Sequence, residues 1–125
     1  MKGKILIVDD EAIILLSWEN MLTSAGYDVE TASNGNKAIE IALKQKPDIV
    51  ITDLIMPEMN GVELCKRIKN ISPDTEVVLL SGHPEAVTNY KTDFIRAGGR
   101  NTILNKPLSL NEMITTVEAI MQEKT

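Results

Sequence analysis

Short apolar runs alternate along the chain with longer segments in which apolar residues recur every three or four positions. The runs predict five strands, at residues 4–9, 27–32, 48–53, 76–81 and 101–105. The first, third and fourth are continuous runs of Val, Ile and Leu, which is typical of parallel strands that are covered on both faces. The second alternates apolar and polar residues, which suits the edge of a sheet.

Five helices are predicted between and after these strands, because apolar residues recur at helical spacing in the remaining segments. In chain order, the apolar faces consist of Leu15, Trp18, Leu22 and Ala25; of Ala38, Ile39, Ala42 and Leu43; of Leu64, Cys65, Ile68 and Ile71; of Val87, Tyr90, Phe94 and Ala97; and of Leu110, Met113, Ile114, Val117, Ile120 and Met121. Ser109 and Glu112 form a capping box that predicts the start of the last helix. Five strand–helix alternations predict an α/β domain in which right-handed crossovers produce an open, doubly wound sheet.

The composition is typical of one globular domain, and we expect residues 1–125 to form it. Of the 125 residues, 43% are hydrophobic and 25% are charged, and no apolar stretch is long enough to cross a bilayer. The N-terminus lacks the apolar segment of a signal peptide, so we expect a cytoplasmic protein that makes no membrane contact. The net charge of −5 argues against direct contact with nucleic acid. Cys65 is the sole cysteine, which excludes a disulfide framework and favours a small buried residue.

Charged and polar residues stand where the predicted strands end. Asp9 and Asp10 follow the first apolar run, and Asp53 closes the third. Ser81 closes the fourth run, and Lys106 follows the fifth. Doubly wound folds place their sites outside the carboxyl ends of the strands, so we expect these five side chains to lie together. Carboxylates about 4 Å apart repel by about 4 kcal/mol per pair at an effective dielectric constant of roughly 20, so the cluster predicts a bound cation.

The residue types in this cluster favour a Mg²⁺ site that takes part in phosphoryl transfer. Oxygen ligands without His or Cys neighbours are typical of Mg²⁺ rather than Zn²⁺, and Mg²⁺ accepts phosphate oxygens alongside carboxylates. Asp53 is the carboxylate best placed to attack phosphorus, which predicts an aspartyl phosphate. Phosphoryl transfer needs positioning and charge neutralisation, which the Lys106 ammonium and the Ser81 hydroxyl can supply.

Each of these residues also has an ordinary structural interpretation. Asp9 and Asp10 can cap the helix that follows them. Lys106 can be plain surface charge, and Ser81 with Gly82 can form a turn. Four different strand ends nevertheless each carry a group suited to one metal-assisted phosphoryl site, and this coincidence favours the functional interpretation.

Together, these residues resemble the signature of response-regulator receiver domains of two-component signalling, of the chemotaxis-regulator-like kind. The resemblance rests on Asp9-Asp10, on the D-x-x-M-P-x-M-x-G pattern of residues 53–61, on Ser81 and on Lys106-Pro107, and it spans essentially the whole chain. It implies a flavodoxin-like (βα)5 fold whose five-stranded parallel sheet has the order 2-1-3-4-5. It also implies a phosphorylation-dependent switch rather than an enzyme, since receiver domains catalyse only their own phosphorylation and dephosphorylation.

By the same resemblance, Asp53 is the phosphoacceptor and receives its phosphoryl group from a sensor histidine kinase or a histidine phosphotransfer protein. Asp10, Asp53 and the backbone carbonyl of Ile55 would bind Mg²⁺ directly, and Asp9 would act through water. The expected output partner is a downstream effector protein or a fused output domain. The expected oligomeric state is a monomer or a phosphorylation-dependent dimer.

The resemblance also assigns Lys106 and Ser81 to the phosphoryl oxygens, with Pro107 as a cis-proline that aims the lysine. In the family, an aromatic residue on the fifth strand couples the hydroxyl to a surface formed by the fourth helix, fifth strand and fifth helix. Ile103 occupies that position here, so the movement of an aromatic ring cannot be carried over. We expect Ser81 to move toward a bound phosphoryl group and to shift the following loop instead. The alternative is a receiver that signals weakly or through another surface.

Two further positions are expected to set the lifetime of the phosphoryl group. In the family, the residues two beyond the phosphoacceptor and two beyond the hydroxyl flank the path of hydrolytic water, and here they are Ile55 and His83. A bulky apolar Ile55 should impede water and predicts slow dephosphorylation. His83 can orient a water, shield the phosphoryl bond or simply be solvated.

Two rival classes use a similar fold. Haloacid-dehalogenase-like phosphohydrolases place their nucleophile in a D-x-D motif after the first strand, and Asp9-Asp10 does not match it. A nucleotide or flavin binder would need a phosphate-cradling loop there, but neither G-x-G-x-x-G nor a Walker A motif occurs. The acidic residues after the first strand would moreover repel phosphate.

Overall fold

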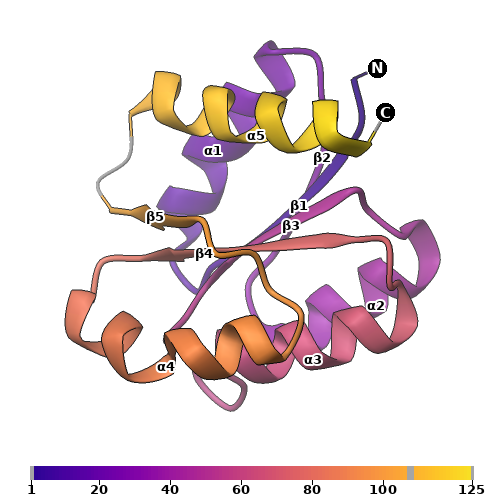
Figure 1. Ribbon diagram of the computed structural model, residues 1–125. Coiled ribbons are helices and arrows are strands. Elements are labelled where there is room, and N and C mark those ends of the chain that lie inside the picture. The colour runs from indigo at the N-terminus through magenta and orange to yellow at the C-terminus, as the bar shows by residue number, and fades with distance from the viewer. Residues whose placement is uncertain (1, 107–108, 125) are drawn as a thin grey trace.

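The computed structural model describes residues 2–106 and 109–124 and shows a parallel sheet between two layers of helices (Figure 1). The strands are β1 (Lys4–Val8), β2 (Asp28–Ala32), β3 (Ile49–Asp53), β4 (Glu76–Ser81) and β5 (Ile103–Asn105). The helices are α1 (Ala12–Ser24), α2 (Gly35–Gln45), α3 (Gly61–Ile71), α4 (Pro84–Arg96) and α5 (Leu110–Lys124). Every strand pairs in parallel in the order β2-β1-β3-β4-β5, which confirms the predicted flavodoxin-like (βα)5 fold.

Alternate residues of the central strands face opposite helix layers. Ile5 and Ile7 of β1 pack in a cluster with residues of α1 and α5, whereas Leu6 and Val8 pack in a cluster with residues of α2, α3 and α4. Figure 1 shows the same division, with α1 and α5 on one face of the sheet and the other three helices on the opposite face. A strand that is covered on both faces is apolar at every position, which explains the continuous apolar runs in the sequence.

The two edges of the sheet differ from the centre. Strand β2 pairs with β1 alone, which confirms the prediction that it lies at an edge. Strand β5 forms the other edge and begins at Ile103, two residues later than predicted. Asn101 and Thr102 are exposed and stay outside the ladder, because an edge strand has a partner on one side only.

Three predicted core positions are wrong. Leu43 is 57% exposed, because the buried face of α2 is centred on Ala38 and Ala42 and the next residue turns outward. Leu110 is 47% exposed at the first position of α5, and Tyr90 is 37% exposed on α4, which buries only Phe94 fully. Within residues 2–106 and 109–124, we find no helix with the length and apolar character needed to cross a membrane.

The loop between β3 and α3 folds back so that the start of α3 lies beside the end of β3. Asn60 caps α3 by accepting a hydrogen bond from the backbone N–H of Glu63 at 3.0 Å, and the N–H of Gly61 donates to the carbonyl of Leu54 at 2.9 Å. A Cβ atom on Gly61 would lie 2.8 Å from the carbonyl oxygen of Asp53, which is closer than side-chain carbons approach. Glycine at this position therefore allows α3 to begin directly beside the end of β3.

We expect Gly61→Ala to lower the free energy of unfolding by roughly 1–3 kcal/mol, because the added methyl group overpacks against the Asp53 carbonyl. Urea denaturation measures this change. Gly82→Ala is the matched control, since its Cβ would approach the Lys106 side chain no closer than an ordinary 3.5 Å. Equal stability of the wild type and Gly61→Ala would contradict the close-approach argument.

Candidate functional site

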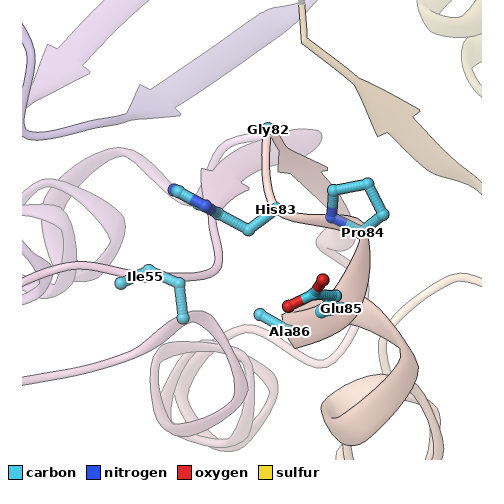
Figure 2. Close-up of a pocket in the computed structure, with 6 residues that line it drawn as sticks. All are labelled: Ile55, Gly82, His83, Pro84, Glu85 and Ala86. Carbon is cyan, nitrogen blue, oxygen red and sulfur yellow. The ribbon is translucent and has the colours of Figure 1, made fainter.

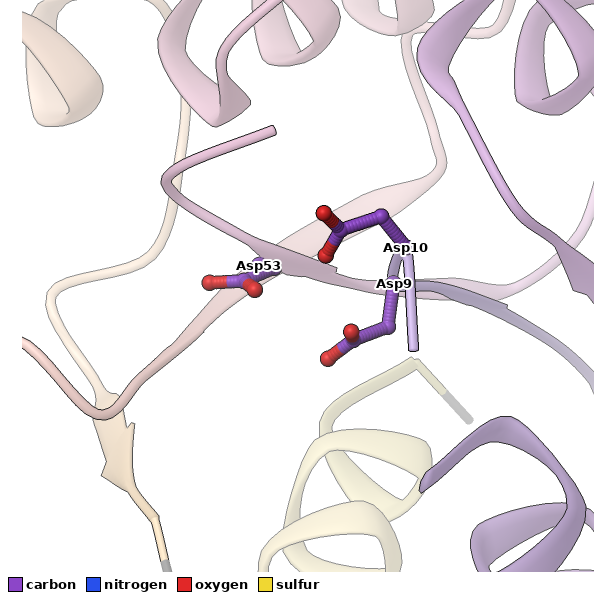
Figure 3. A group of neighbouring side chains, drawn as sticks. All are labelled: Asp9, Asp10 and Asp53. Atoms are coloured by element: carbon purple, nitrogen blue, oxygen red, sulfur yellow. The ribbon is translucent and has the colours of Figure 1, made fainter. Parts of the chain in front are cut away.

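The predicted site residues gather at the carboxyl edge of the sheet. Asp53 is the last residue of β3, and Asp9 and Asp10 directly follow β1, its neighbour in the sheet. Figure 3 shows the three carboxylates meeting in the space beyond these strand ends. One oxygen from each carboxylate can be chosen so that all three lie within 4.8 Å of one another. The predicted acidic cluster is therefore present.

The three carboxylates differ in their exposure and their partners. Asp9 is completely buried, Asp53 is 5% exposed, and Asp10 is exposed. Asp9 Oδ1 accepts a hydrogen bond from the backbone N–H of Glu11 at 2.9 Å. Glu11 occupies the N-cap position of α1 without a side-chain cap of its own, so Asp9 satisfies one N–H group at the start of this helix as well as belonging to the cluster.

Lys106 reaches into the cluster from the end of β5. Its Nζ atom lies 2.8 Å from Asp9 Oδ2, 3.2 Å from Asp53 Oδ2 and 4.0 Å from Glu11 Oε1. The Lys106 side chain is only 16% exposed, which contradicts the alternative that it is plain surface charge. The ammonium thus bridges the two buried carboxylates and joins the ends of β1, β3 and β5.

Burial and charge act on these groups in opposite directions. Burial by itself lowers the pKa of Lys106, but its hydrogen bonds to Asp9 and Asp53 and their negative charges outweigh this effect and raise the pKa. Burial raises the pKa of Asp53, the Lys106 ammonium opposes this shift, and the Asp9 charge adds to it, so that the net change is upward. Lysine is therefore held charged, whereas Asp53 is held in an environment that disfavours its negative charge.

The residues present fit a divalent cation. One ammonium faces three carboxylates, so the cluster keeps an excess negative charge of two when all are ionised. Asp53 Oδ1 is buried without a hydrogen-bond partner among the described residues, so this oxygen is free to coordinate a cation. An all-oxygen donor set is what Mg²⁺ prefers, and an unpartnered buried oxygen beside an exposed carboxylate suits it.

Ser81 ends β4 and is 2% exposed. Its Oγ accepts a hydrogen bond from the backbone N–H of His83 at 3.0 Å, so the hydroxyl does form the turn that was weighed as an alternative. The β3–β4 register pairs Asp53 with Leu80, which places Ser81 one residue beyond the level of Asp53 on the adjacent strand. The turn and the proposed site therefore involve the same hydroxyl.

Ile55 and His83 both line an open pocket of about 490 Å³ beside the strand ends. Figure 2 shows the two side chains flanking this space, with the first turn of α4 forming the remaining wall. Ile55 is 44% exposed, so its apolar side chain is free to cover the approach to the site. Ile103, the residue in place of the family's aromatic, is half-buried against the core on the α4 side of the sheet. Pro107, the expected cis-proline, lies outside the described residues.

Trp18 is a neighbour of the site that its position in the sequence does not reveal. It lies on the buried face of α1, as helical spacing predicts, and the centroid of its indole ring lies 5.9 Å from Lys106 Nζ. Helical spacing could show that Trp18 points toward the sheet. Its contact with the lysine depends on how α1 and the end of β5 lie in space, which the local sequence does not encode.

This protein is a doubly wound α/β domain. Its candidate site is an acidic cluster, bridged by a lysine, at the carboxyl edge of the sheet. The family model of the response regulator receiver domain matches residues 5–118. The chain therefore belongs to the response regulator receiver domain family, as the sequence motifs predicted. Members of this family act in two-component systems and partner with histidine kinases and fused output domains.

Individual relatives agree with this assignment. The chain is 33% identical over 121 residues to the chemotaxis protein CheY of Thermotoga maritima, covering 96% of this chain and 98% of that protein. It is 32% identical to the alkaline phosphatase synthesis transcriptional regulatory protein PhoP of Bacillus subtilis, covering 98% of this chain but 50% of that protein. Among solved structures, the chemotaxis protein CheY4 of Vibrio cholerae superposes with a TM-score of 0.86 at 29% identity, covering 94% of this chain and 98% of that one.

A receiver domain protein from Clostridium thermocellum superposes with a TM-score of 0.87 at 30% identity, covering 98% of this chain and 96% of that one. The chain thus spans nearly the full length of some relatives and about half the length of others.

Asp53 predicts a pH dependence of stability with a defined sign. Its pKa is higher in the folded protein than in the unfolded chain, so folding favours the neutral acid. Its contribution to stability should be complete below the unfolded pKa of about 3.9 and should be lost as the pH rises through the raised folded value. The free energy of unfolding of the wild type minus that of Asp53→Asn should therefore fall as the pH rises above about 4, without divalent ions. Urea denaturation along this pH series measures the difference, and a difference that rises with pH would be inconsistent with it.

Proposed function

We propose that this chain is a phosphorylation-dependent switch in which Asp53 accepts a phosphoryl group from a phosphohistidine of a sensor kinase or phosphotransfer protein. The observation that carries the proposal is the buried Oδ1 atom of Asp53, which has no hydrogen-bond partner within residues 2–106 and 109–124 and belongs to a lysine-bridged acidic cluster. A carboxylate oxygen without a hydrogen bond keeps its lone pairs available for attack on phosphorus.

The transfer step has a simple balance. An oxygen of Asp53 forms a bond to phosphorus while the bond from phosphorus to the histidine nitrogen of the donor breaks. The donor imidazole leaves with the electron pair of that bond and takes a proton from solvent. The phosphoryl group retains its oxygens, so the work of this chain is to position the group and to neutralise its charge.

Lys106 and Ser81 are the groups of this chain that would hold the phosphoryl oxygens. Lys106 already bridges Asp9 and Asp53, and it needs only to exchange one carboxylate oxygen for a phosphoryl oxygen. Ser81 carries a hydroxyl that donates when its side chain turns toward the new anion. Asp10, Asp53 and the carbonyl of Ile55 would hold Mg²⁺, with Asp9 acting through water, and the ion would supply the remaining positive charge.

The proposed output is a change in the surface formed by α4, β5 and α5. His83 begins α4 as its N-cap residue and donates its N–H to Ser81, so a movement of the hydroxyl shifts the start of this helix. Ile103 lacks a ring, and the proposed transmission therefore runs through the backbone of the β4–α4 turn.

The partner at this surface would be an effector protein or a fused output domain, and phosphorylation would shift the chain between monomer and dimer. The proposed switch would act in the cytoplasm together with its phosphohistidine donor, and nothing in the proposed output requires this chain itself to contact nucleic acid.

Intact-mass measurement tests the phosphoacceptor. Incubation with acetyl phosphate and Mg²⁺ should add one phosphoryl group to the wild type and none to Asp53→Asn, because the amide is a poor nucleophile. Removal of Mg²⁺ with a chelator should abolish labelling. Continuous turnover of small phosphate esters with no labelled protein would instead identify a phosphohydrolase and overturn the proposal.

Ile55 is expected to prolong the life of the aspartyl phosphate. Ile55→Asn replaces an apolar cover by a side chain that orients water, so the decay of the phosphorylated protein should be faster by about tenfold, which corresponds to about 1.4 kcal/mol in the barrier. Leu43→Asn is the matched control, since Leu43 is also an exposed apolar residue but lies on α2, away from the site. The loss of the added mass with time measures both rates, and equal decay in the wild type and Ile55→Asn would rule out an apolar shield.

A further inference from the structure

Trp18 faces the lysine of the acidic cluster from the side of α1. The Lys106 ammonium lies over the indole ring, 5.9 Å from its centroid. Trp18 is 6% exposed and the Lys106 side chain is 16% exposed, so the contact is largely removed from solvent. An ammonium within about 6 Å of an indole face is attracted by the ring quadrupole, and the attraction grows as water is excluded.

The indole differs in kind from the other groups around the ammonium. Asp9, Asp53 and Glu11 are anionic and compensate its charge. The ring attracts the ammonium without neutralising it and has no oxygen that competes for its hydrogen atoms. Lysine is a flexible four-carbon stem with three rotatable donors, and a packed ring beside its tip limits the positions that it can take.

We propose that Trp18 is a positioning residue for Lys106, whose indole keeps the ammonium at the acidic cluster while it exchanges a carboxylate oxygen for a phosphoryl oxygen. The part of this inference that concerns the phosphoryl group rests on the proposed function, whereas the contact between ring and ammonium does not. Trp18 also belongs to the core cluster beneath α1, which fixes the ring and gives it the rigidity that positioning requires.

Three variants separate the ring from its packing. Trp18→Phe keeps an aromatic face, Trp18→Leu removes it, and Leu22→Ala damages the same core cluster on the same helix without touching Lys106. The rate of Asp53 labelling by subsaturating acetyl phosphate with Mg²⁺ should fall about fivefold in Trp18→Leu and stay within about twofold of the wild type in Trp18→Phe. Leu22→Ala should label at the wild-type rate although it is less stable.

Two outcomes of the labelling experiment overturn the positioning role. One is a wild-type rate in Trp18→Leu, and the other is an equal loss in Trp18→Phe and Trp18→Leu, which would show that bulk rather than the aromatic face matters. If the wild type itself is not labelled, the proposed function fails. The contact is then decided by a second measurement that needs neither metal nor phosphodonor.

That measurement uses the emission of Trp18, which is the sole tryptophan of the chain. Lys106→Met removes a positive charge beside the indole and should change its emission spectrum in the unphosphorylated, metal-free protein. Lys91→Met, at an exposed position on α4, should leave the spectrum unchanged. Identical spectra for the wild type and Lys106→Met would overturn the proposed contact.

Discussion

The bridge from Lys106 to Asp9 and Asp53 is the interaction on which the rest of the site depends. Without it, two carboxylates with almost no exposure would face each other across the ends of neighbouring strands. A buried charge left without its partner typically costs about 3–5 kcal/mol. The bridge also joins residues 97 and 53 positions apart, so the site exists only once β1, β3 and β5 have all taken their places.

The same bridge leaves part of the negative charge of the cluster uncompensated, which matters for the proposed binding of Mg²⁺ and phosphoryl groups. A single ammonium compensates only part of the charge of three carboxylates, and one oxygen of Asp53 has no hydrogen-bond partner in the part of the chain that the structure describes. A fully compensated cluster would bind neither a cation nor a phosphoryl group, since each of its atoms would already be satisfied. We therefore attribute the proposed affinity of the cluster for Mg²⁺, and its proposed reaction with a phosphoryl group, to this uncompensated charge and to the oxygen without a hydrogen bond.

The sequence predicted most of this arrangement because strand ends are visible in it. Continuous apolar runs mark the strands of a parallel sheet, and the residue after each run falls at one edge regardless of how the helices pack. This is why Asp9, Asp53 and Lys106 could be placed together from spacing alone. Exposure on the helices was harder to predict: helical spacing gives the centre of an apolar face but not its width, and it placed Leu43 and Leu110 inside.

The relatives differ in length, and this difference bears on how a signal could leave the domain. The chain matches nearly all of one chemotaxis protein and only half of a transcriptional regulatory protein, and both alignments include the strand ends that form the cluster. The part of this chain that carries the acidic site therefore lies inside both matched segments, whereas the longer protein has a further part that the match does not cover. Because one fold can be joined to different parts, the proposed signal would have to leave through the surface of the domain.

Within this domain, the backbone provides such a route. The N–H of Lys106 donates to the carbonyl of Ser81 at 2.9 Å, so the two groups proposed to hold the phosphoryl oxygens are tied to each other. Ser81 is tied in turn to His83 at the start of α4. A displacement of either side chain toward a new anion therefore acts on β5 and α4 together, and both belong to the proposed output surface. A ring at position 103 would add to this coupling, but two backbone-anchored hydrogen bonds already connect the site to both elements, which is why Ile103 is compatible with a switch.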